Sequence, residues 1–457
     1  MAGTWKRFSS CADSRKRWLI APIAILALSL GVYAIRTHLE RAVAAISIYR
    51  AHVFTPPPLA HGESRLHWLL ANAQFYWDFS EIRVARQRRL KQLDPLLRPL
   101  VKEIARHQAA GEGMQYSMHI YREIRWRLNF TPDVETTRAR IVDLRQSLAQ
   151  PELQRLAIGQ QASDGSWGLG IDVWYLKLYY SVEDGLSSRG ANPQYPLTFL
   201  DRINTPEKLT AQLDSDLRDD FTKTGVFNRE ELDETFSALA RLLFGTKRTG
   251  YTFDPGLKDA MRQFVARWQN PATGCWGQWM LDRQGRIWKM DDMAMTFHVI
   301  SDLHGQVEHK DLIARRLLQL DNVNFPAGIL FDGHYENHLN WDAVKIFRAA
   351  WPALDEPTRQ QARTEITRML DWCLTQSYQP DGSFKVSDLD DTLGDAYSYA
   401  VSFLRETGYF RREDRFWTGQ EFPEANAVRD RIAARLQSIG LSDPGLKDAY
   451  DQLQSVR

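Results

Sequence analysis

The segment QPDGSFKVSDLDDTLGDAYSYAVSFLRETG, residues 379–408, shows the pattern on which most of the chain is built. A glycine, Gly382, stands two residues before an aromatic side chain and opens a short polar loop. A run with apolar residues at helical spacing follows and ends at Gly408. Such spacing is typical of an amphipathic helix, and a glycine is a common helix end. The segment therefore predicts a loop followed by one helix that buries a single face.

Similar glycine signals recur along the chain at nearly constant distance. They begin at Gly111, Gly165, Gly225, Gly274, Gly328 and Gly382, with intervals of 54, 60, 49, 54 and 54 residues. An interval near 54 residues fits one helical hairpin with its loops. The sequence therefore predicts an all-α fold, an α/α toroid of about six helical hairpins.

The repeat keeps its register at the level of single residues. Thirteen positions before the closing glycines 185, 305 and 408 stand Asp172, Asp292 and Asp395. Asp233 and Asp342 occupy similar places in two other repeats. Aspartate is a preferred helix cap, which is the simple explanation of each one. Five carboxylates at one mouth of the ring would also raise one another's pKa, as functional carboxylates often do.

An apolar segment near the N-terminus predicts a membrane anchor. Residues 18–35 are uncharged, and at 1.5 Å per residue they just span a ~30 Å hydrocarbon layer. Basic residues concentrate before this segment, which places residues 1–17 in the cytoplasm and the body on the non-cytoplasmic side. We therefore expect a single-pass protein of the cell membrane.

The remaining boundaries follow from the anchor and the repeat. Residues 36–58 form a juxtamembrane segment that ends in the stiff spacer Pro56-Pro57-Pro58. Residues 59–157 hold leading helices and the first hairpin, residues 158–420 hold the toroid repeats, and residues 421–457 hold C-terminal helices.

Composition excludes some classes of partner. The formal net charge is +1, with 58 Lys and Arg against 57 Asp and Glu, so no nucleic-acid partner is expected. Three cysteines without a metal-binding spacing predict no cysteine-built metal site, and no cofactor or metal is expected. The 15 tryptophans provide flat aromatic surfaces that suit sugar rings, isoprenoid chains and carbocations.

A glutamine precedes three of the glycine signals, in QASDGSW from Gln161, QNPATGCW from Gln269 and QPDGSF from Gln379. This resembles the QW repeat of the terpenoid cyclase and protein prenyltransferase superfamily. The resemblance implies an α/α toroid in which the glutamine and the aromatic residue tie hairpins together. It bears on fold and not on activity.

The last repeat adds the acidic sequence Asp388-Leu-Asp390-Asp391-Thr392, which resembles the DxDDT motif of class II terpene cyclases. The resemblance implies that Asp390 is the catalytic acid and that Asp388 and Asp391 support it. Asp292 and Asp395 are further catalytic candidates. Protonating an alkene needs a strong acid in a dry pocket with aromatic faces. The aromatic candidates are Trp276, Trp279, Trp288 and Trp341.

The leading hypothesis is therefore an acid-initiated cyclase acting on an isoprenoid or another lipid-like small molecule. The alternative is an (α/α)6-barrel glycoside hydrolase or polysaccharide lyase acting on a glycan outside the cytoplasm. Such an enzyme needs a pair of carboxyl groups. Asp172, Glu336 and Asp342 are substrate-binding candidates, and the loop around Glu336 is the densest polar and aromatic patch in the chain. A third possibility is a non-catalytic binding scaffold.

Overall fold

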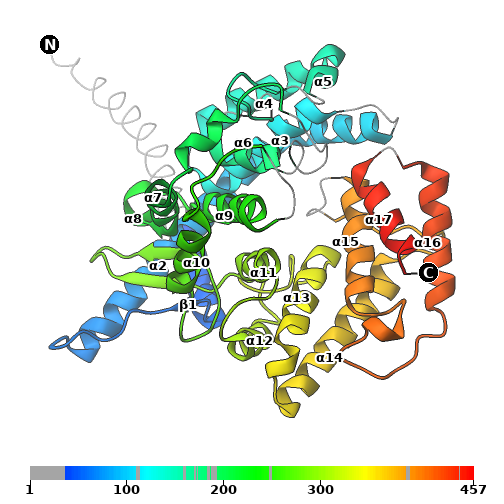
Figure 1. The fold of residues 1–457 in the computed structure, drawn as a ribbon. Coiled ribbons are helices and arrows are strands. Elements are labelled where there is room, and N and C mark those ends of the chain that lie inside the picture. The colour runs from blue at the N-terminus through cyan, green and yellow to red at the C-terminus, as the bar shows by residue number, and fades with distance from the viewer. Residues whose placement is uncertain are drawn as a thin grey trace, which may run out of the picture.

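The computed structural model describes residues 36–109, 114–157, 161–168, 171, 173–182, 186, 193–245, 250–387, 392–441 and 443–456. Most of this part is helical, as predicted (Figure 1). Within it, no helix has both the length and the apolar composition that a bilayer span requires. The predicted anchor, residues 18–35, lies outside the described residues, as do Asp172 and Asp388–Asp391.

Residues 36–51 are helical and precede the first strand. The later α-helices are α2 (Arg65–Ala109), α3 (Gln115–Phe130), α4 (Val134–Leu148), α5 (Pro151–Ala157), α6 (Trp174–Tyr180), α7 (Pro206–Leu217), α8 (Phe221–Thr224), α9 (Arg229–Phe244), α10 (Leu257–Trp268), α11 (Met293–Asp302), α12 (Lys310–Gln319), α13 (Asn337–Ala350), α14 (Glu356–Trp372), α15 (Leu393–Glu406), α16 (Ala425–Ile439) and α17 (Pro444–Gln454). Short 3-10 segments are η2 (Thr198–Arg202), η3 (Trp351–Ala353) and η5 (Arg412–Asp414), and a π-helical turn, η4, spans Cys373–Ser377.

The helices form two layers along the repeat region. In the inner layer, α6, α9, α11, α13, α15 and α17 each contact the next one. On the outer side, α10 packs on α7 and α9, while α12 packs on α13 and α14. Figure 1 shows α9, α11, α13 and α15 as an arc with α10, α12 and α14 outside it. The alternation of inner and outer helices follows the predicted hairpin order.

A small sheet that the sequence pattern did not predict joins the N-terminal segment to a repeat. Its strands are β1 (Phe54–Thr55), β2 (Arg218–Asp219), β3 (Trp279–Leu281) and β4 (Ile287–Met290), in the order β1-β4-β3-β2. β3 and β4 form an antiparallel hairpin, and β1 adds to its edge through Phe54 and Met290. Residues 54–55, expected in the juxtamembrane segment, are therefore part of the folded body.

The repeat turns carry matching contacts. The side-chain amide of Gln161 donates to the carbonyl of Gly165 (2.6 Å) and to that of Tyr195 (3.1 Å). Gln269 makes the equivalent pair, to Gly274 (2.8 Å) and to Glu308 (3.0 Å). Each glutamine thus closes its own loop and bonds to a segment 34 or 39 residues later. Gln161 and Gln269 therefore connect segments that are distant in sequence.

The glycines of these turns are required by close backbone approach. Gly165 has φ +82°, and a Cβ there would lie 2.2 Å from the carbonyl oxygen of Pro196. Gly382 has φ +87°, and its Cβ would lie 2.5 Å from the carbonyl oxygen of Arg431. Only glycine combines this φ with this approach at low energy. Gly165 and Gly382 therefore mark points where two segments distant in sequence touch through their backbones.

Three hydrophobic clusters are buried in the described part of the chain, the smallest of them formed by Ile171 and residues of α6. The largest one extends from Ile48 to Val456 and includes the repeat helices and the first part of α2. A second one lies among α2, α3 and α4, with Leu93 and Leu144 fully buried. The leading helices therefore have a core of their own.

Candidate acid-base site

The centre of the site is the buried guanidinium of Arg229, at the start of α9. Its Nε lies 2.5 Å from Oδ2 of Asp292, and one terminal nitrogen lies 3.0 Å from Oδ1 of the same carboxylate. The other contacts go to Oδ2 of Asp233 (3.1 Å) and Oε2 of Glu230 (2.6 Å). Burial alone would lower the pKa of Arg229, but these three carboxylates raise it above its ordinary value. Arg229 therefore remains charged and joins α9 to α11.

Asp292 is a helix cap, which was the simple explanation of its position in the repeat. It precedes α11, accepts a hydrogen bond from the backbone nitrogen of Met295, and is fully buried. Burial raises the pKa of Asp292, while the Arg229 cation and its hydrogen bonds oppose that rise. A carboxylate held by a cap bond and by a bidentate arginine is poorly placed to donate a proton. The geometry of Asp292 thus indicates a structural role.

His298 of α11 connects this network to the rest of the site. Its Nδ1 lies 2.7 Å from Oδ1 of Asp233. Burial lowers the pKa of His298, but the Asp233 carboxylate outweighs burial and raises it to about 9. In turn, burial raises the pKa of Asp233, and His298 and Arg229 more than offset this, so the pKa of Asp233 falls below its ordinary value. The two side chains therefore form an ion pair between α9 and α11 at neutral pH.

The pKa of Asp342, on α13, shifts in the opposite direction to that of Asp233. It is buried, its Oδ1 has no hydrogen-bond partner in the described part of the chain, and its Oδ2 lies 3.9 Å from Nε2 of His338. Burial raises the pKa of Asp342 well above its ordinary value, and Glu336 and Asp233 add to that rise against an opposing effect of His298. These surroundings therefore favour the protonated form of Asp342, whereas those of Asp233 favour the ionised form.

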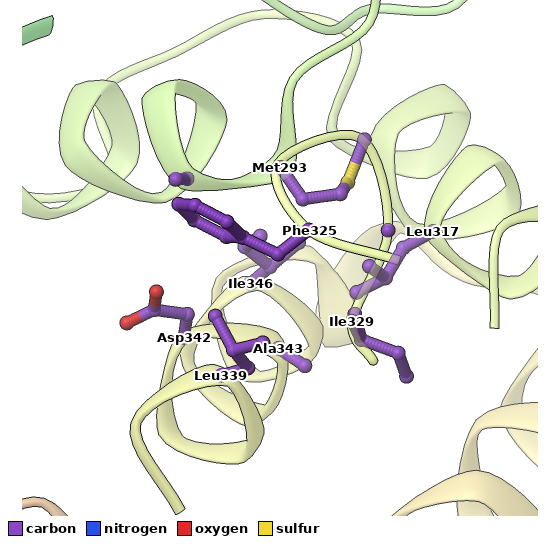
Figure 2. A pocket seen from close by; sticks show the side chains of 10 residues that line it. Met293, Leu317, Phe325, Ile329, Leu339, Asp342, Ala343 and Ile346 are labelled. Carbon is purple, nitrogen blue, oxygen red and sulfur yellow. The ribbon is translucent and has the colours of Figure 1, made fainter. Parts of the chain in front are cut away.

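Asp342 also borders a cavity of about 10 Å³, room for roughly one water molecule. Figure 2 shows its carboxyl group beside the otherwise apolar wall, directed away from those side chains. The other labelled residues of the wall are Met293, Leu317, Phe325, Ile329, Leu339, Ala343 and Ile346. This cavity is too small for a substrate, so a ligand would have to approach Asp342 from its other side.

Glu234 is a second carboxyl group whose pKa is raised. Burial raises its pKa well above the ordinary value, and the charges of Glu230 and Asp233 add to the rise. Its Oε2 has no hydrogen-bond partner among the described residues. It lies four residues after Glu230 and therefore on the same face of α9. α9 thus carries carboxyl groups whose pKa values shift in opposite directions.

Aromatic and cationic side chains adjoin these acids. The ring of His338 stacks on Tyr399 of α15 with centroids 3.9 Å apart, and Trp341 lies 6.0 Å from the same tyrosine ring. Nζ of Lys345 donates to Oγ of Ser301 (2.9 Å) and lies 5.1 Å from the centre of Trp341. Trp341 and Lys345 are partly exposed. These contacts join α11, α13 and α15 next to Asp342.

Tyr179 of α6 is a further ionisable residue whose pKa is shifted by groups on other helices. Burial raises its pKa, and the nearby groups that act on it are Glu234, Arg241 and Tyr399. Glu234 lies on α9 and Tyr399 on α15, so α6, α9 and α15 border the same interior region. The helices of the arc thus surround one polar centre.

The sequence-predicted residues fall into distinct places. Glu336 caps α13 by accepting from the backbone nitrogens of His338 and Leu339, and Oγ of Ser387 donates to its Oε1 at 3.2 Å. Asp395 forms a capping box with Thr392 at the start of α15. The two described neighbours of the acidic sequence 388–391, Ser387 and Thr392, thus lie at helix starts next to the site.

The predicted aromatic residues are separated. Trp276 and Trp288 are 1% and 0% exposed in the hydrophobic core, and Trp288 stacks on Phe75 at 3.9 Å. Trp279 lies on β3 under the ammonium group of Lys289, 4.7 Å from its ring centre. Of the four, only Trp341 lies beside Asp342. The aromatic lining expected for a carbocation pocket is therefore not assembled from the other three.

Sequence reasoning missed the basic members of the site. The pattern Arg229-Glu230-x-x-Asp233-Glu234 places two i,i+4 pairs on one helical turn, which was a readable signal for a charged face. His298 stands in the apolar run MAMTFHVIS, where an ionisable residue was a second signal. No group of three His, Cys, Asp or Glu side chains is placed to hold a metal ion within the described ranges.

Comparison with known proteins adds no assignment. No family model, no curated protein and no solved structure matches the chain.

Proposed function

We propose that the chain is an enzyme that hydrolyses a glycan by acid-base catalysis in the centre of an α/α toroid. The observation that carries the proposal is the contrast between two buried carboxyl groups: Asp233 is held by Arg229 and His298, whereas Oδ1 of Asp342 has no hydrogen-bond partner among the described residues, so their pKa values shift in opposite directions. Pairs of carboxyl groups whose surroundings push their pKa values apart are typical of acid-base enzymes. A glycoside hydrolase needs such a pair.

The roles follow from these pKa shifts. Asp342, whose protonated form is favoured, donates its proton to the glycosidic oxygen as the bond from that oxygen to the anomeric carbon breaks. A water molecule forms the new bond to the anomeric carbon, and its proton passes to the Asp233 carboxylate. His298 and Arg229 position that carboxylate and keep it ionised before the reaction. Trp341 offers a flat surface for a sugar ring beside the acid.

The charges around the acids favour a hydrophilic substrate. Arg229, His298 and Lys345 are cations or are protonated at neutral pH, and such groups destabilise a carbocation intermediate in their vicinity. Lys345, partly exposed beside Trp341, offers hydrogen bonds to sugar hydroxyl groups instead. For this reason the glycan hypothesis now stands ahead of the isoprenoid cyclase.

The cyclase remains the second candidate because of one observation. Ser387 contacts Glu336 and Thr392 begins α15, so both described ends of the Asp388–Asp391 sequence lie beside the proposed site. Isoprenoid substrates are therefore part of the test.

The toroid and the anchor are proposals as well. The serial contacts from α6 to α17, together with the action of Glu234 and Tyr399 on Tyr179, support a closed ring of hairpins. The apolar run of residues 18–35 supports a membrane anchor with the body on the non-cytoplasmic side. A tethered hydrolase of this kind would act on glycans near the membrane surface.

The experiment compares the wild type with Asp342→Asn and Asp233→Asn against a polysaccharide panel and an isoprenoid panel. We expect turnover of a polysaccharide and a loss of about 100-fold or more in kcat for each variant. Asp214→Asn is the matched control because Asp214 is a surface partner of Arg267, far from the acids in the fold. Isoprenoid turnover without polysaccharide turnover would select the cyclase, and full activity of Asp342→Asn would remove Asp342 as the acid.

A further inference from the structure

Exposed apolar side chains are concentrated at the N-terminal end of the described chain. The described residues include 13 exposed large hydrophobic side chains, and eight of these lie between Leu39 and Leu70. A face of this kind, gathered in one short stretch, marks an interaction surface. The remaining five are scattered over the rest of the described residues.

The apolar residues form stripes on two helices. Leu39, Val43 and Ile46 are 63%, 60% and 52% exposed and have the i, i+4, i+7 spacing of one helical face. At the start of α2, Leu66, Leu69 and Leu70 are 67%, 49% and 62% exposed and have the i, i+3, i+4 spacing. We call these six residues the N-terminal apolar face.

The helix of residues 36–51 packs on α2 through the side that carries Arg41, and its contacts on α2, Trp77 and Glu81, continue the side of Leu66 and Leu70 further along that helix. Arg41 pairs with Glu81 at 2.9 Å and its guanidinium lies over the ring of Trp77, while Tyr49 meets Tyr76 edge to face. Ile48 is buried in the main core. The apolar face is thus presented on a rigid support, with its own side chains left uncovered by the described part of the protein.

The position of this face in the chain identifies its occupant. The uncharged run of residues 18–35 ends one residue before the helix that carries Leu39, Val43 and Ile46. A segment that enters a bilayer holds the residues that follow it at the bilayer surface. There an amphipathic helix buries its apolar side chains between the headgroups.

Charge points to the same occupant. Arg50 and Arg65 are exposed and form no ion pair with a described residue, and they flank the apolar stripes. Basic residues at the edge of an apolar face are attracted to anionic lipid headgroups.

We propose that the N-terminal apolar face rests on the surface of the lipid bilayer that holds residues 18–35. The proposal rests on the anchor proposed above and not on the glycan hydrolysis. It implies that the body is held against the membrane in a defined orientation and does not swing on a flexible tether.

The test uses the full chain with Cys11→Ser, since Cys275 and Cys373 are buried. Single cysteines replace Val43 or Leu69, and Val142→Cys is the matched control, because Val142 is 48% exposed on α4, outside the face. Each is labelled with an environment-sensitive fluorophore and reconstituted in phosphatidylcholine vesicles with brominated acyl chains. We expect a blue shift and about twofold or more stronger quenching at positions 43 and 69 than at 142.

Equal quenching at all three positions, in chains that resist carbonate extraction, would overturn the proposal and leave the anchor intact. Release of the chain by carbonate would overturn both. A blue shift at positions 43 and 69 without quenching by brominated lipid would show that protein, such as a second copy, covers the face, and would also overturn it. Adding phosphatidylglycerol should strengthen quenching in the wild-type background, and Arg50→Gln with Arg65→Gln should remove that gain.

Discussion

Nδ1 of His298 lies 2.7 Å from Oδ1 of Asp233, and this contact joins two inner helices through residues that are 65 positions apart. The other oxygen of Asp233 is held by Arg229, which also binds Asp292. A single chain of charged groups thus runs from α9 to the start of α11. Oδ1 of Asp342, close to this network, has no hydrogen-bond partner among the described residues.

The His298 ion pair predicts a pH-dependent stability. The pKa of His298 is raised from 6.5 to about 9, so its contribution is complete below pH 6.5 and is lost as the pH rises through 9. We expect the wild type to lose about 2 to 3 kcal/mol relative to His298→Gln across this interval. Urea unfolding at several pH values measures the difference. The same slope for wild type and His298→Gln would contradict the assignment, and His304→Gln at an exposed position is the control.

Asp292→Asn should destabilise the protein by about 3 to 5 kcal/mol, because it leaves the buried guanidinium of Arg229 short of its bidentate partner. The free energy of unfolding, measured in urea, reports this cost. Asp355→Asn, which alters an exposed helix cap, should leave the stability nearly unchanged, because asparagine caps helices about as well as aspartate. An Asp292→Asn protein with wild-type stability and no activity would indicate that Asp292 is catalytic instead.

The turn glutamines should differ in importance. Gln269→Ala removes two hydrogen bonds, one of which reaches a segment 39 residues away, and should cost about 1 to 3 kcal/mol. Gln379 donates only to the carbonyls of Ser377 and Tyr378 in its own loop, so Gln379→Ala should cost less, about 1 kcal/mol. Thermal unfolding of the two variants makes the comparison. Equal losses would argue against a tie between hairpins at Gln269.

Two glycines with similar φ allow the stability cost of backbone strain to be measured apart from the cost of a close contact. Gly165→Ala places Cβ 2.2 Å from the carbonyl oxygen of Pro196, whereas Gly250 has φ +73° and open space around it. We expect Gly250→Ala to cost about 1 kcal/mol from φ alone, and Gly165→Ala to cost about 3 kcal/mol or more. Denaturant midpoints provide the measurement. If both variants lose the same amount, the contact between hairpins at Gly165 is not tight.

The pH dependence of activity should follow the two carboxyl groups. Asp233 is ionised down to a pH below the ordinary aspartate pKa, and Asp342 stays protonated well above it, so kcat should be high across the neutral range. Asp342→Glu should retain part of the activity with a shifted basic limb, because it keeps a carboxyl group in a changed position. An unchanged basic limb in Asp342→Glu would mean that another group donates the proton.

Much of the helical organisation was readable from the sequence. The spacing of apolar residues predicted a helical protein, and the count of 13 residues to the closing glycine located Asp292 and Asp395 at helix starts, Asp292 as the cap of α11 and Asp395 in the first turn of α15, in a capping box with Thr392. Hydrophobic spacing, capping and turn chemistry act within a few residues, so a short stretch of sequence is enough to show them.

The composition of the site was decided by the tertiary structure. Arg229 binds Asp292, which stands 63 positions later in the chain, and Tyr399 of α15 acts on the pKa of Tyr179 of α6. The sequence did not show that Trp276 and Trp288 fill the core while Trp341 stays partly exposed beside Asp342. The sequence by itself determined which residues start, end and cap the helices. Only the packing of the helices decided which acids are paired and which have a raised pKa, because pKa values depend on burial and on charges brought in by other helices.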